Sequence, residues 1–213
     1  MPSKPTRSRR RAAPYHHGDL RAALLRAAEE ELAERGTEDF SLRGVARRVG
    51  VSHAAPAHHF ADAGALLTAL AAEGFRRFLA TQRDHQARAP ADPRAQLLAA
   101  GAGYVAFAAA NPPLFRLMFA SQRPDRRDAE LCEAARAAFE HLAQGVAAAN
   151  PQGGSPGLDM MAAWAMAHGI ADLLNAGQLD LLVPAGARGE MIAAALRRAL
   201  GLDRAAGQSS AEG

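Results

Sequence analysis

Apolar residues recur along most of the chain at intervals of three and four, which is the spacing of one face of an α-helix. Alanine, leucine, arginine and glutamate are abundant, whereas β-branched residues are scarce. No alternating apolar and polar pattern runs far enough to predict a useful strand. The pattern therefore predicts an all-α fold.

The first predicted helix covers residues 19–35. Asp19 lies at its beginning, where a negative charge complements the helix dipole, and Gly36 follows its last turn as a stop signal. The apolar positions form one stripe, which predicts one buried face and consists of Leu20, Ala23, Leu24, Ala27, Ala28 and Leu32.

Two short helices are predicted next. Ser41 is the expected N-cap of the second helix, and Gly50 ends it. Ser52 is the N-cap candidate of a third, very short helix that closes near His59 and Phe60. Their length and turn chemistry are typical of a helix-turn-helix, although an ordinary helical hairpin has the same pattern.

The rest of the chain is predicted to form a helical bundle. A long fourth helix begins near Asp62 and connects the two parts, before Pro90 and Pro93 break it. Further helices are expected over 93–110, 112–120, 126–149, 157–178 and 187–200. The predicted organisation is a disordered arm, a helix-turn-helix domain, the bundle and a disordered tail, over residues 1–14, 15–61, 62–203 and 204–213.

The basic residues cluster, although the 213-residue chain as a whole is nearly balanced, with 25 basic and 22 acidic residues. Lys4, Arg7, Arg9, Arg10 and Arg11 give five positive charges to the first eleven residues, among prolines and serines that disfavour folding. We expect this arm to contact DNA phosphates or the minor groove, and the alternative is a solvated tail.

The sequence lacks the residues that several other classes of protein require. Cys132 is the single cysteine, so an intrachain disulfide and a structural zinc cluster are excluded, and a reducing cytoplasm is expected. No secretion signal and no membrane span is predicted. The pairs His16-His17 and His58-His59 are adjacent on a helix and do not face each other, so neither chelates a metal alone. Without a nucleophile–base pair or a nucleotide fingerprint, the sequence predicts no enzyme, cofactor or metal.

Three segments carry a resemblance to a known family: Leu-Arg-Gly-Val-Ala at 42–46, Val-Gly-Val-Ser at 49–52 and His-His-Phe at 58–60. With them, residues 15–70 resemble the TetR family of transcription regulators. Farther on, Trp164-Ala-Met-Ala-His168-Gly169 is similar to a C-terminal domain named for a Trp-His-Gly signature.

The resemblance implies that the segment from Ser52 to His59 enters the major groove, while the helix after Ser41 crosses the DNA backbone. Arg43 is the best candidate for a charged or bidentate contact. The residues expected at DNA, including those of the arm, are Arg9, Arg10, Arg11, His17, Ser41, Arg43, Ser52, His53, Ala54, Ala55, His58 and His59. The residues expected in the core instead are Val45, Ala46, Val49 and Phe60.

The sequence departs from the family pattern at three positions. Ala57 replaces a phosphate-binding tyrosine, Ala63 replaces a lysine, and Pro56 replaces a leucine. Two backbone contacts are therefore missing, and proline removes an amide donor from the expected recognition helix. Our hypothesis is that the basic arm compensates, because phosphate attraction is independent of sequence.

The C-terminal half concentrates aromatic and sulfur-containing residues, and the resemblance implies a ligand cavity among them. Ordinary core packing is the alternative for any single one. His168 either orients a polar group of the ligand or is a buried histidine paired with a backbone carbonyl. The candidate ligand-binding residues are Tyr104, Phe107, Phe119, Met160, Trp164 and His168.

The resemblance also implies that the last two helices form a four-helix interface in a homodimer, which suits a palindromic operator. The candidate interface residues are Ile170, Leu173, Leu174, Met191, Ile192, Ala195 and Leu196. The predicted function is a sequence-specific transcription regulator, a repressor that a small hydrophobic effector releases from double-stranded operator DNA. The alternative is an architectural DNA-binding protein without an effector.

Overall fold

The computed structural model describes residues 17–151 and 155–199, and within them it contains α-helices and short 3-10 turns but no strand. The all-α prediction is therefore confirmed. The predicted arm with Arg9, Arg10 and Arg11 and the predicted tail at 204–213 lie outside the described residues.

The N-terminal part contains α1 (His17–Arg35), α2 (Leu42–Val49) and the 3-10 turn η1 (Ala55–His58). Ser41 caps α2 as predicted, because its Oγ accepts a hydrogen bond from the Gly44 amide at 3.1 Å. Gly50 ends α2 with φ 77°, a left-handed conformation that glycine adopts without a Cβ penalty.

The predicted third helix is wrong in form. Ser52 caps nothing with its side chain, and the residues after it form only η1, whose N-cap is Ala54. In an α-helix that followed Ser52, the first amide to bond its carbonyl would be that of residue 56, and Pro56 has no amide hydrogen. The Ala55 amide bonds the Ser52 carbonyl at 3.0 Å instead, and this i to i−3 bond is the 3-10 pattern.

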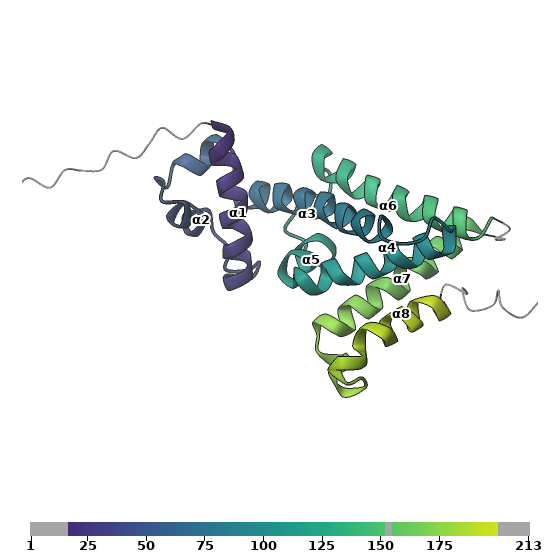
Figure 1. Cartoon of the computed structure of the whole chain (residues 1–213). Coiled ribbons are helices and arrows are strands. Elements are labelled where there is room, and N and C mark those ends of the chain that lie inside the picture. The colour runs from purple at the N-terminus through teal and green to yellow at the C-terminus, as the bar shows by residue number, and fades with distance from the viewer. Residues whose placement is uncertain (1–16, 152–154, 200–213) are drawn as a thin grey trace, which may run out of the picture.

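The bundle consists of α3 (Ala63–Gln86), α4 (Pro93–Ala110), α5 (Pro112–Phe119), α6 (Ala129–Ala149), α7 (Pro156–Asn175) and α8 (Arg188–Ala199), with 3-10 turns at Gln178–Leu181 and Ala185–Ala187. Asp62 caps α3, since its carboxylate accepts from the Ala65 amide at 2.8 Å. Figure 1 shows α3 leading from α1 and α2 into the bundle, where it packs against α4, α5 and α6, while α7 and α8 lie beyond α4.

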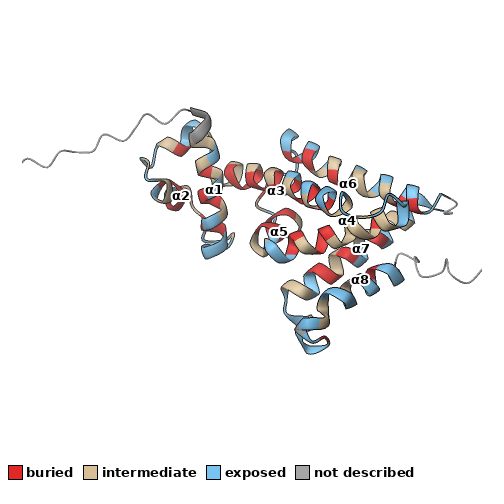
Figure 2. Cartoon of the chain, viewed as in Figure 1, coloured by how far each residue is buried: buried red, intermediate tan, exposed pale blue. Residues whose placement is uncertain are grey.

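The buried residues form one large cluster that continues from α1 through α3 into α4, α5, α6, α7 and α8. Figure 2 shows buried positions along the inner faces of these helices and exposed positions on the outer faces of α7 and α8. Gly103 lets α4 approach α3 closely, because a Cβ there would lie 2.8 Å from the Gln82 Cα. The long helix α3 therefore belongs to the cores of both parts.

Among the described residues, no single helix is long and apolar enough to cross a membrane. Of the described helices, only α4 and α5 taken together reach the required length and apolar composition, and the two helices are bent by 110° relative to each other.

Candidate functional site

The surface around α2 and η1 exposes most of the residues expected at DNA. Arg43 lies exposed on the first turn of α2, and His53, Ala54 and His58 are exposed along the turn and η1. Ala55 and His59 are half-buried. Val45, Ala46, Pro56 and Phe60 are buried beneath them, and Val49 is half-buried. His17 is the first residue of α1, and its contact with DNA stays a prediction.

A buried carboxylate fixes α2 against α1. Glu31 is 2% exposed, and its Oε2 accepts a hydrogen bond from Arg48 Nε at 2.7 Å. Arg48 also makes two hydrogen bonds to the carboxylate of Glu34. These bonds lower the pKa of Glu34 and raise that of Arg48, so both groups stay charged. The α2 helix packs on the same carboxylate through Gly44, where a Cβ would lie 2.0 Å from Glu31 Oε1. This cluster sets the position of Arg43.

Polar contacts connect the N-terminal helices to the bundle. Arg77 of α3 donates to Glu29 of α1 at 2.6 Å and to Asn111 at 2.8 Å. Arg123, after α5, donates to the Thr37 carbonyl, after α1, at 2.9 Å. The position of α1 is therefore tied to those of α3 and α5.

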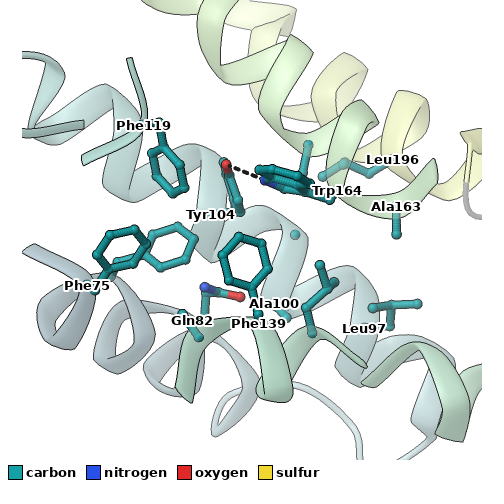
Figure 3. A pocket seen from close by; sticks show the side chains of 15 residues that line it. Phe75, Gln82, Leu97, Ala100, Tyr104, Phe119, Phe139, Ala163, Trp164 and Leu196 are labelled. Carbon is teal, nitrogen blue, oxygen red and sulfur yellow. Dashed lines mark hydrogen bonds between the residues drawn. The ribbon is translucent and has the colours of Figure 1, made fainter. Parts of the chain in front are cut away.

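An apolar cavity lies in the bundle between α3, α4, α5, α6, α7 and α8, and its volume is about 40 Å³. That is room for roughly three water molecules. Figure 3 shows aromatic rings surrounding it. The lining residues are Phe75, Phe78, Gln82, Leu97, Ala100, Gly101, Tyr104, Phe119, Ala138, Phe139, Leu142, Ala163, Trp164, Ala167 and Leu196.

Tyr104 and Trp164 form a satisfied polar network at one side of the cavity. Trp164 Nε1 donates to the Tyr104 hydroxyl at 3.3 Å, and the Tyr104 oxygen lies 2.6 Å from His168 Nδ1. Because an indole only donates, the Tyr104 oxygen accepts from Trp164, while the direction of its hydrogen bond with His168 Nδ1 depends on the histidine tautomer. His168 Nε2 lies 3.4 Å from a carboxylate oxygen of Asp172. Burial raises the pKa of Tyr104, so this hydroxyl stays protonated.

Two family profiles match the chain: "Bacterial regulatory proteins, tetR family" over residues 24–70, and "Tetracyclin repressor-like, C-terminal domain" over residues 97–201. The chain belongs to the TetR family. It is a DNA-binding transcription regulator, and the first match contains α2 and η1 of the helix-turn-helix.

Solved structures agree with this assignment. A protein with unknown function from Rhodococcus sp. RHA1 is 36% identical, with a TM-score of 0.78, and the match covers 89% of this chain and 98% of that one. A TetR-like transcriptional regulator from the same organism is 17% identical, with a TM-score of 0.63 and coverage of 88% and 99%. The fatty acid degradation regulator FadR from Bacillus halodurans is 15% identical, with a TM-score of 0.66 and coverage of 84% and 97%. At these lower identities, the likeness is one of fold. No curated protein matches this TetR-family chain in sequence.

The cavity of this TetR-family protein includes three of the six predicted ligand-binding residues, Tyr104, Phe119 and Trp164. His168 does not line it, but it contacts three residues that do, Tyr104, Phe119 and Trp164. Phe107 lies in the core, with its ring centroid 5.4 Å from that of Phe78, and does not line this cavity, so its contact with a ligand stays a prediction. Met160, near the beginning of α7, does not line it either.

The predicted dimer residues divide into two groups. Leu173, Met191 and Ala195 are exposed, and Leu174 and Ile192 are half-buried. Ile170 and Leu196 are buried in the core of the same chain, and their part in an interface stays a prediction. Leu196 packs on Gly101 of α4, with its methyl carbons 3.5 Å from a Cβ built at Gly101.

Sequence reasoning missed Leu158, Met161, Met166, Leu181 and Leu182 among the exposed apolar residues, and Gln82 among the residues of the cavity. The exposed large apolar side chains of the described residues all lie on α7, the turn after it or α8, and they are Leu158, Met161, Met166, Leu173, Leu181, Leu182 and Met191. Gln82 was also missed in the cavity, although the sequence held a signal. It follows Phe75 and Phe78 at helical spacing, and is a polar residue on an apolar face.

Proposed function

We propose that this regulator is a homodimeric repressor whose affinity for a palindromic operator falls when a small apolar effector fills the cavity. As a bacterial DNA-binding protein, it is proposed to act in the cytoplasm. The observation that carries the proposal is the path of α3, which begins directly after the recognition turn and supplies Phe75, Phe78 and Gln82 to the cavity.

The proposed contact with DNA uses the exposed surface of α2 and η1. Arg43 contributes a charge on the first turn of α2, while Ala54 and Ala57 offer small apolar contacts of the kind that thymine methyl groups accept. His53 and His58 add hydrogen-bonding groups from the same surface. In this proposal, the arm with Arg9, Arg10 and Arg11, together with His17, adds contacts to phosphate.

Dimerisation is proposed through the exposed apolar surface of α7 and α8. Leu173 is 46% exposed and Met191 51% exposed, and the turn after α7 adds Leu181 and Leu182 at 82% and 76%. Large apolar surfaces of this kind mark interaction sites in folded proteins. A two-fold axis through this surface would present two recognition turns to the two halves of a palindrome.

The size of the cavity supports a coupling between effector and DNA. Ligand sites typically enclose about 300–1,000 Å³, and the volume here is about 40 Å³. An effector larger than a few waters therefore has to push helices apart. Because α3 is tied to α1 through Arg77 and Glu29, a displaced α3 carries α1 and the recognition turn with it. Such coupling is typically worth about 1–3 kcal/mol.

A gel-shift assay on DNA upstream of the regulator's own gene tests the DNA-binding surface. We expect Arg43→Ala to weaken specific binding about 10-fold to 100-fold, the range of a good bidentate contact. Arg94→Ala is the matched control, since Arg94 is exposed on α4 far along the chain from the recognition turn. Equal affinity of both variants would refute the role given to Arg43. Binding without sequence preference would favour the architectural alternative.

Sedimentation equilibrium tests the dimer. A Leu173→Asp, Met191→Asp double variant should be monomeric, because both carboxylates would be desolvated in the proposed interface. Ala109→Asp, at an exposed position on α4, should leave the mass unchanged. A dimeric double variant would place the interface elsewhere.

A further inference from the structure

The cavity contains one polar group that no part of the described chain satisfies. Its lining includes no acidic, basic or histidine side chain, and its hydrogen-bonding side chains are Gln82, Tyr104 and Trp164. Tyr104 and Trp164 are bonded to each other, and Tyr104 also to His168. The Gln82 amide makes no side-chain hydrogen bond to any described residue, although Gln82 is only 4% exposed.

The position of Gln82 is fixed by its backbone. The α4 helix lies close to α3 at this residue, because a Cβ on Gly103 would lie 2.8 Å from the Gln82 Cα and 3.2 Å from its nitrogen. Figure 3 shows the Gln82 side chain ending among the aromatic residues that line the cavity. The amide is thus held at a set point of an otherwise apolar wall.

The Gln82 amide faces the cavity without a partner from the described chain, and polar groups inside proteins are nearly always paired with a protein group, a ligand or water. A primary amide offers one acceptor oxygen and two donor hydrogens. A ligand group that pairs with it can therefore be an amide, a carbonyl or a hydroxyl. The absence of any charged side chain from the lining disfavours a carboxylate or an ammonium, because burying an unpaired charge costs far more than burying a neutral polar group.

We propose that Gln82 is the specificity-determining residue of the cavity, and that the effector is an uncharged, largely apolar molecule with a neutral hydrogen-bonding group that pairs with the Gln82 amide. This inference rests on the effector cavity of the proposed function. The rings of Phe75, Phe78 and Phe139 hold the apolar part of the ligand, and Gln82 selects among ligands of similar shape. A site built for a hydrogen bond rejects an analogue that lacks it, since the amide would then stay unpaired.

Three probes that share one benzene ring test this inference: benzamide, benzoate and toluene. Trp164 is the single tryptophan of the chain and lines the cavity, so its fluorescence reports occupancy directly. We expect Gln82→Leu to weaken benzamide binding by about 10-fold or more relative to toluene, the usual effect of losing a buried polar partner. Benzoate should bind neither protein measurably. Gln144→Leu repeats the substitution at an exposed position of α6 and should keep the original preference.

The outcomes separate the two ideas. If toluene binds and Gln82→Leu leaves the ratio of benzamide to toluene affinity unchanged, Gln82 is not the selecting group, while the cavity remains an effector site. If benzoate binds as tightly as benzamide, the neutral-ligand inference is overturned. If no probe changes Trp164 fluorescence in the unsubstituted protein, the effector cavity itself is refuted and the Gln82 inference with it. Gln82→Met serves as a second variant if Gln82→Leu does not fold.

Discussion

Replacing Gly44 by alanine should destabilise the N-terminal part, even though alanine is the better helix former. The added Cβ would lie 2.0 Å from Glu31 Oε1, 2.5 Å from its carboxyl carbon and 2.9 Å from Oε2. Glu31 is buried and held by Arg48 Nε at 2.7 Å, so its carboxylate cannot move aside without breaking that ion pair. Either the pair breaks or α2 moves away from α1.

The magnitude follows from two opposing contributions. Overpacking a filled site costs about 1–3 kcal/mol, and an overlap as large as this one belongs at the upper end. Alanine recovers about 1 kcal/mol over glycine within a helix. The net loss is therefore about 2 kcal/mol, which corresponds to a fall in Tm of about 4–8 °C for a chain of this size.

Thermal unfolding followed by circular dichroism measures this effect in Gly44→Ala, with Gly157→Ala as the control. A Cβ at Gly157, in the first turn of α7, would meet nothing within 4 Å, so we expect no loss of stability there. Adding Glu31→Ala removes the carboxylate atoms that the new methyl group would overlap, and the double variant should then be no less stable than Glu31→Ala alone. A Gly44→Ala protein with unchanged Tm, or strictly additive effects in the double variant, would refute the reasoning.

Two further predictions concern the cap of α3 and the buried phenol. Asp62→Ala should lose about 1 kcal/mol of unfolding free energy in a denaturant titration, because the Ala65 amide loses its acceptor. Asp84→Ala, at an exposed position late in α3, is the control. Equal losses in the two variants would argue against capping by Asp62. Burial raises the pKa of Tyr104 above its ordinary value of 10.0, so the native phenol keeps its proton at a pH where the unfolded one releases it. The stability from this difference is complete below pH 10.0 and is lost as the pH rises above that value. The Tm of Tyr104→Phe should therefore decline less above pH 10 than the Tm of the unsubstituted protein. An identical decline in both proteins would contradict a raised pKa of Tyr104.

Local signals were sufficient for most of the helix boundaries. Ser41 and Asp62 cap their helices with their own side chains, and Gly50 adopts the left-handed conformation that ends α2. These features depend on a few neighbouring residues, so the sequence pattern contains them. Ser52 is an N-cap residue by the same local signal, but no α-helix follows it, because Pro56 four residues later removes the amide that an α-helix would require.

Features that depend on how helices meet were less accessible. Ile170 and Leu196 are apolar residues on amphipathic helices, and only the packing of α7 and α8 on α4 shows that they face their own chain. Phe107 is buried on α4 like Tyr104, yet only Tyr104 lines the cavity. The contact of Glu31 with Arg48 and Gly44 joins two helices at a distance along the chain that no local pattern encodes. The predicted domain boundaries remain a prediction.

The proline-shortened turn has a consequence for how much DNA sequence one subunit can read. At about 2 Å of rise per residue, the four residues Ala55–His58 extend roughly 8 Å along their axis. Neighbouring base pairs are spaced about 3.4 Å apart, so this length faces only two or three of them. In the proposed mode of binding, discrimination between genomic sites therefore also depends on Arg43 of α2, on the spacing of the two half-sites and on the local stiffness and groove width of the intervening DNA.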